Sequence, residues 1–185
     1  MPFEGQKRIY TACGILFTVS VLYITANALP IWVTGSFEPT VVTFGLWKIC
    51  GKNKDISNCV NMPSVVDDKT TATQAFITIC CILAPLSVIS ILSIILVNEN
   101  LKKHMSVLAK VLAIASLISG IIGIGLGISF VVDIIKGIDA LKSIPGFTIE
   151  AASKIGDFKM GVSCILAIVA VALNLVGAVI TFLIR

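Results

Sequence analysis

Cysteines are the main side chains that could do chemistry in this sequence of 185 residues. There are six of them, with a single histidine, His104. Four lie inside long apolar stretches, where a thiol usually serves as a small apolar side chain. These four are Cys13, Cys80, Cys81 and Cys164. Cys50 and Cys59 instead flank Gly51–Asp55, whose composition is typical of a turn. Two such thiols can form a disulfide or supply half of a zinc site.

The residue patterns of common enzymes do not occur in the sequence. There is no cluster of metal ligands, no Gly-x-Ser-x-Gly turn and no Walker loop. The glycines from Gly123 to Gly127 resemble a phosphate-binding loop, but no strand-forming run precedes them and the surrounding stretch is apolar. We therefore expect a protein that is not an enzyme and that uses no cofactor and no metal.

The composition indicates that the elements carrying these residues cross a membrane. Apolar residues make up 57% of the chain and charged residues 13%, and the mean hydropathy is +1.03. A soluble domain of this size could not bury so much apolar surface. Four uncharged stretches each exceed the roughly 20 residues that span the hydrocarbon core. We expect helices near 9–29, 73–97, 109–132 and 160–184, in an all-α membrane protein formed by a single domain, 1–185.

The first stretch has an alternative interpretation. Basic Lys7 and Arg8, followed by an apolar run and Ala26-Asn27-Ala28, also fit a cleaved signal peptide. The run is long for that role, and cleavage would leave three spans with an odd topology. We favour a first membrane helix.

Basic residues beside the spans orient the chain by the positive-inside rule. Lys7 and Arg8 precede the first span, a lysine-containing link of about ten residues joins the second and third, and Arg185 closes the fourth. Both termini and this link are therefore expected in the cytosol, with outer loops near 30–72 and 133–159. The formal charge of +4 lies on the cytosolic side, and the outer loops balance to zero. Orientation accounts for this charge, so we expect no nucleic-acid partner.

This topology separates the two interpretations of the outer cysteines. Cys50 and Cys59 face an oxidising compartment, whereas His104 lies on the opposite side, so a zinc site lacks ligands. We expect a disulfide, whose ring of about ten residues removes roughly 2–3 kcal/mol of unfolded-chain entropy. His104 with Lys102 and Lys103 is expected to form a solvated basic loop, or alternatively to touch anionic lipid headgroups.

Inside the spans, the small and polar residues indicate helix packing. No span core carries an ionisable acid, base or histidine, which argues against a pump or a charged pore. Asn174, midway along the fourth span, is expected to hydrogen-bond another helix rather than a substrate. Small residues that recur at every fourth position of the third span predict a stripe for close helix approach. They are Ala115, Ser119, Gly123 and Gly127.

The first outer loop contains several runs that favour strands. Residues 31–34, 41–44, 46–49 and 59–60 are rich in β-branched and aromatic side chains. They predict a small antiparallel sheet in which the disulfide joins two adjacent strands.

The second outer loop begins with an outward continuation of the third helix. Ile134, Ile138 and Leu141 recur at helical spacing and predict an amphipathic extension that lies against the first loop or a neighbouring molecule. A Pro-Gly turn follows this extension. Phe147 and Ile149 in the turn are candidates for contacting a neighbour, or alternatively for packing under the same domain.

The residues of the first outer loop also form an ordered set. Trp32 is followed by Gly45, Leu46 and Trp47, and then by Cys50 and Cys59. This set resembles the W…GLW…C…C signature of the claudin / peripheral myelin protein / epithelial membrane protein superfamily. The resemblance implies a four-transmembrane-helix bundle with a small extracellular antiparallel β-sheet. It implies that the tryptophans and the GLW segment seat the sheet on the bundle.

The resemblance also implies a function and partners. We expect a multi-pass plasma-membrane protein of cell–cell junctions that forms or tunes a paracellular barrier. Its partners would be membrane lipid, further copies in the same membrane and a like protein on the facing cell. Two alternatives remain, a regulatory subunit bound laterally to a channel or receptor, and a membrane organiser like the epithelial membrane proteins.

Overall fold

The computed structural model describes residues 2–53, 56–62, 68–142 and 155–184. Four long helices make up most of them: α1 (Pro2–Ala28), α2 (Asp68–Leu96), α3 (Glu99–Lys142) and α5 (Val162–Phe182). Each contains a stretch long and apolar enough to cross a membrane. The chain is therefore mostly helical and has the character of a multi-pass membrane protein, as its composition predicts.

The helices extend further than the uncharged stretches do. α1 begins at Pro2 and α3 at Glu99, so α2 and α3 are joined by Val97–Asn98 alone. The third helix was expected to begin near residue 109, so its start was predicted ten residues too late. Lysine and glutamate are good helix formers, so a charged residue marks where the hydrocarbon ends and not where the helix ends.

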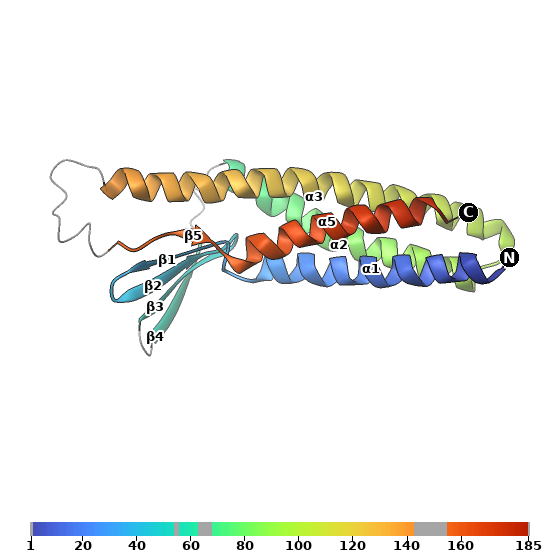
Figure 1. Cartoon of the computed structure of the whole chain (residues 1–185), viewed down its shortest axis with the longest axis horizontal. Helices are drawn as coiled ribbons and strands as arrows, with labels where there is room; N and C mark the ends of the chain where they lie inside the picture. The colour runs from blue at the N-terminus through green and yellow to red at the C-terminus, as the bar shows by residue number, and fades with distance from the viewer. Residues whose placement is uncertain (1, 54–55, 63–67, 143–154, 185) are drawn as a thin grey trace.

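The helices form a bundle with the two termini at one end and the sheet at the other (Figure 1). α1 packs against α2 and α5, and α3 packs against the same two helices. α3 has 44 residues, about 66 Å of helix at 1.5 Å per residue, which is twice the thickness of a hydrocarbon core. Its last turns therefore project beyond the other helices, and the predicted outward extension to Lys142 is confirmed.

The buried face of α3 differs from the predicted stripe. Gly123 and Gly127 are buried, but Ala115 and Ser119 are half-buried at the flank. An α-helix has 3.6 residues per turn, so a repeat of four drifts around the helix by about 40° at each step. The buried line alternates steps of three and four instead. It runs through Ala113, Ser116, Gly120, Gly123 and Gly127.

A five-stranded antiparallel sheet stands on the bundle. Its strands are β1 (Val33–Phe37), β2 (Thr40–Phe44), β3 (Lys48–Asn53), β4 (Ile56–Asn61) and β5 (Lys159–Met160), in the order β4-β3-β2-β1-β5. The expected strand at 46–49 begins two residues later, and the expected turn from Gly51 is shorter because β3 continues to Asn53. β5 was not predicted. It pairs with β1, so the segment before α5 and the segment after α1 contribute to one sheet.

Candidate functional site

The five-stranded sheet is held by the disulfide that the sequence predicts. Cys50 on β3 and Cys59 on β4 lie directly opposite each other in the antiparallel register. Their sulfurs are 2.06 Å apart and their Cα atoms 4.1 Å apart. The bond therefore joins two adjacent strands at the side of the sheet farthest from β5.

Trp32 lies fully buried where the sheet meets the bundle. Its indole Nε1 donates a hydrogen bond to the Ala26 carbonyl at 3.0 Å. That carbonyl would normally accept from the residue four positions later, which is Pro30 and has no N–H. The Trp32 indole thus supplies the donor that the last turn of α1 lacks.

The surroundings of Trp32 tie several elements together. A Cβ at Gly127 of α3 would lie 2.6 Å from Trp32 Cζ3, so glycine is needed for α3 to pass this ring. The Trp32 backbone N–H donates to the Phe44 carbonyl at 2.8 Å, and its carbonyl accepts from Gly161 N–H at 2.7 Å. Ser163 N–H donates to the Ile31 carbonyl at 3.0 Å. The end of α1, the start of α5 and the sheet are thereby joined at one point.

The Gly45–Trp47 segment forms the link between β2 and β3 and rests on the helix ends. Gly45 passes so close to the Pro30 backbone that a Cβ there would collide with it. Leu46 is fully buried, and its carbonyl accepts a hydrogen bond from the Gln74 side chain of α2. Trp47 is 46% exposed, and its Nε1 donates to Asn27 Oδ1 of α1 at 2.8 Å. The two tryptophans therefore lie in different environments.

Phe158 packs under the inner part of the sheet and was not singled out from the sequence. Its ring centre lies 5.3 Å from that of Phe37 and 6.2 Å from that of Phe44. The α3 extension covers the same cluster through Ile134, Ile135 and Ile138, which are partly buried. Phe158 lies between charged Asp157 and Lys159, so a single aromatic residue in a polar run was the only signal in the sequence.

The same face of the sheet is covered at one side and open at the other. One cross-strand row contains a residue from each of the five strands, namely Met160, Val33, Phe44, Ile49 and Val60. Val33 is fully buried, whereas Val60 is 68% exposed. Ile56 belongs to the same face of β4 and is 66% exposed. We call Ile56 and Val60 the apolar edge.

An ion pair links the outer ends of two helices. Lys69 Nζ of α2 lies 2.7 Å from Asp133 Oδ2, the first charged residue after the uncharged part of α3. This hydrogen bond holds the pKa of the Asp133 carboxyl below its ordinary value. Both side chains are half exposed, so the pair orients the helix ends more than it stabilises the fold.

Asn174 lies fully buried in the interior of the bundle. Its Nδ2 donates to Ser116 Oγ of α3 at 3.1 Å. Cys80 of α2 donates to the Ser116 carbonyl at 3.5 Å, and the Tyr23 hydroxyl of α1 lies against Gly120. Side chains from all four helices meet at this level. Over the described parts of the chain, no three histidine, cysteine or acidic residues come close enough to hold a metal ion.

The predicted contact residues Phe147 and Ile149 lie outside the described residues. No protein-family model matches the sequence, and no curated protein matches it either.

Proposed function

We propose that this chain is a claudin-like protein of cell–cell junctions in the plasma membrane. In this proposal, copies associate side by side and contact like proteins on the facing cell, and the outer sheet forms or tunes a paracellular barrier. The cytosolic end carries the two termini.

The observation that best supports the proposal is the exposure of the sheet at its terminal strand β4. The apolar edge presents Ile56 and Val60, both about two-thirds exposed, on a strand outside the apolar stretches. Both side chains lie on the same face of β4, separated by Asn58, and they offer apolar contacts to another protein beside the backbone of this strand. β4 is also the terminal strand of the sheet, so its outer backbone groups are available to a further strand.

The rigidity of the sheet supports the same proposal. The disulfide fixes β4 to β3, and Phe158 with the α3 extension supports β1 and β2 from beneath. A surface held in one shape loses little conformational entropy on binding. Such a surface is suited to repeated contacts between identical copies.

A cell-mixing experiment tests the proposal. Cells without junction proteins that express a tagged chain are mixed with cells that do not express it, and the label is measured at each kind of contact. We expect enrichment only where two expressing cells meet. Uniform label over the cell surface would contradict adhesion between like copies.

Two variants refine this experiment. Ile56→Ser with Val60→Ser removes the apolar edge, and we expect it to lower the enrichment at contacts without lowering surface delivery. Val41→Ser is the matched control, because Val41 is also exposed but points to the opposite face of the sheet. Equal loss of enrichment in both variants would argue against the apolar edge as the contact surface.

A second candidate function is a regulatory subunit of a channel or receptor. Gly125 on α3 and Gly14 on α1 face outward, and nothing lies within 4 Å of the place where a Cβ would be. Outward glycines in membrane helices allow another helix to approach closely. Uniform surface label, together with a partner that co-purifies with the native chain but not with Gly125→Leu, would favour this function.

A further inference from the structure

The end of the bundle opposite the sheet contains a hollow between three helix ends. It has a volume of about 460 Å³ and is lined by the lysines of the first turns of α3, Lys102, Lys103 and Lys110. Its apolar lining comes from three different elements, with Ile94 from α2, Val107 from α3 and Ile184 from the residues after α5. A basic, partly apolar hollow thus lies at the level where the helices leave the membrane.

Two interactions connect basic side chains at this end of the bundle to the end of α5. Lys110 Nζ lies 6.0 Å from the centre of the Phe182 ring, within the range of a cation–π contact. Arg8 Nη1 of α1 donates to the Leu183 carbonyl at 3.5 Å and so joins α1 to the end of α5. Lys110 therefore faces the hollow next to α5 and adds its charge to that of the other two lysines.

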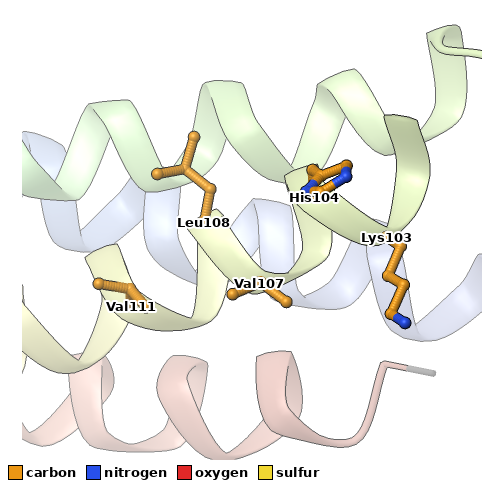
Figure 2. A pocket seen from close by; sticks show the side chains of 5 residues that line it. All are labelled: Lys103, His104, Val107, Leu108 and Val111. Carbon is orange, nitrogen blue, oxygen red and sulfur yellow. The ribbon is translucent and has the colours of Figure 1, made fainter. Parts of the chain in front are cut away.

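A second, shallow hollow of about 500 Å³ adjoins the first on the surface of α3, and all its lining residues belong to this helix (Figure 2). The two share Lys103 and Val107, and the second adds Leu108, Val111 and His104. Figure 2 shows Lys103 pointing toward the end of α5, with Leu108 on the other side of α3. Val111 is the first residue of the uncharged part of α3, so this second hollow leads from the lysines toward the hydrocarbon.

Charge and apolar lining together identify a ligand class. The positive-inside rule requires basic residues at this end, but it does not require three lysines around one hollow with an apolar lining. Basic pockets between membrane helices on the cytosolic side bind lipid headgroups. A soluble phosphate compound has no apolar group that could contact the apolar residues beyond Val107.

We propose that this pair of hollows binds one anionic phospholipid of the cytosolic leaflet. Its phosphate groups contact Lys102, Lys103 and Lys110, and an acyl chain lies along Val107 and Val111. Three ammonium groups favour a headgroup with several negative charges, such as a phosphorylated phosphatidylinositol, over one with a single charge. The inference requires that the four helices span a membrane with this end in the cytosol, and it is independent of the proposed junction function.

Native mass spectrometry of the purified full chain in detergent tests the inference. The probes are phosphatidylinositol bisphosphate, phosphatidylserine and soluble inositol trisphosphate, which has the headgroup without acyl chains. We expect one bound lipid, with phosphatidylinositol bisphosphate binding most tightly. Inositol trisphosphate that binds as tightly as the lipid would overturn the proposal, because the ligand would then be a soluble phosphate compound.

Charge variants locate the site. Each lysine near a membrane surface contributes about a fivefold change in binding of an anionic lipid, so K102Q/K103Q/K110Q is expected to lower affinity by about a hundredfold. The matched control removes the same charge at the sheet end through K48Q/K52Q/K136Q and is expected to stay within about twofold of the native chain. Equal losses in the two variants would show unspecific attraction and overturn the proposal.

Two further variants keep the result interpretable if the triple variant does not fold. K102R/K103R/K110R retains the charge and is expected to retain binding. Lys103→Glu changes one exposed residue that lines both hollows and is expected to lower affinity by about tenfold or more. Unchanged binding by Lys103→Glu would contradict the site.

Discussion

Replacing Trp32 tests whether the contact between the sheet and the helix bundle stabilises the fold. A buried tryptophan removes about 150–250 Å² from water, and at roughly 25 cal/mol per Å² this corresponds to about 4–6 kcal/mol as an upper limit. Truncations of core tryptophan cost about 3–5 kcal/mol. We expect Trp32→Ala to lower the free energy of unfolding by this amount, because the ring is fully buried against α3.

Trp32→Phe separates the hydrogen bond from the apolar ring. Phenylalanine keeps most of the ring but cannot donate to the Ala26 carbonyl, and Pro30 offers that carbonyl no replacement donor. An unsatisfied buried acceptor costs about 1–3 kcal/mol. Trp47 supplies the matched controls, since it is 46% exposed and its hydrogen bond is at the surface. We expect Trp47→Ala and Trp47→Phe each to cost less than about 1 kcal/mol.

Reversible unfolding in mixed micelles measures these free energies. The chain has two tryptophans, so Trp47→Phe leaves Trp32 as the single indole fluorophore and Trp32→Phe leaves Trp47. Trp32 alone should emit at shorter wavelength and resist a water-soluble quencher, whereas Trp47 alone should be quenched. Equal destabilisation by the two alanine variants, or equal quenching of the two fluorophores, would refute the claim that Trp32 is the buried, stabilising tryptophan and Trp47 the exposed one.

Three further predictions concern the bundle and the disulfide. Gly127→Ala should cost about 1–3 kcal/mol by overpacking, whereas Gly125→Ala, with open space around it, should be neutral or stabilising by up to about 1 kcal/mol in thermal unfolding. Cys50→Ala with Cys59→Ala should cost about 2–3 kcal/mol, and surface labelling should show reduced delivery to the plasma membrane. Asn174→Leu breaks the hydrogen bond to its partner serine on α3 and should cost about 0.6–2 kcal/mol, measured by unfolding in micelles.

Features that are encoded by apolar stretches or by the spacing of apolar residues could be predicted from the sequence. Long uncharged stretches predict the four helices because lipid requires about 20 apolar residues for each crossing. The disulfide follows from two cysteines in strand-forming runs of one outer loop. The extension of α3 follows from the helical spacing of Ile134 and Ile138, which is independent of tertiary contacts.

Features that depend on tertiary contacts were missed. β5 has two residues, Lys159 and Met160, and it becomes a strand only because β1 lies beside it. Phe158 has no pattern of its own, and its role arises from the rings of Phe37 and Phe44 more than a hundred positions earlier in the chain. The start of α3 was predicted too late because hydropathy indicates whether a residue lies in lipid or in water, and does not indicate its backbone conformation.

The two tryptophans of the motif show the same difference between local signals and tertiary contacts. The sequence motif singles out Trp32 and Trp47 together, yet one is fully buried and the other is half exposed. The difference arises from Gly127, which leaves room for one ring, and from Pro30, which leaves one carbonyl in need of a donor. Neither relation is visible from the spacing of the tryptophans.

The hydrogen bonds at Ile31 and Trp32 have a mechanical consequence. A single residue, Gly161, separates β5 from α5, and its N–H is bonded to the Trp32 carbonyl, while Ser163 is bonded to Ile31. These bonds tie the sheet to the ends of α1 and α5, so we expect a tilt of the two helices to turn the sheet with them. A change in bilayer thickness, which changes helix tilt, would then also change the orientation of the sheet.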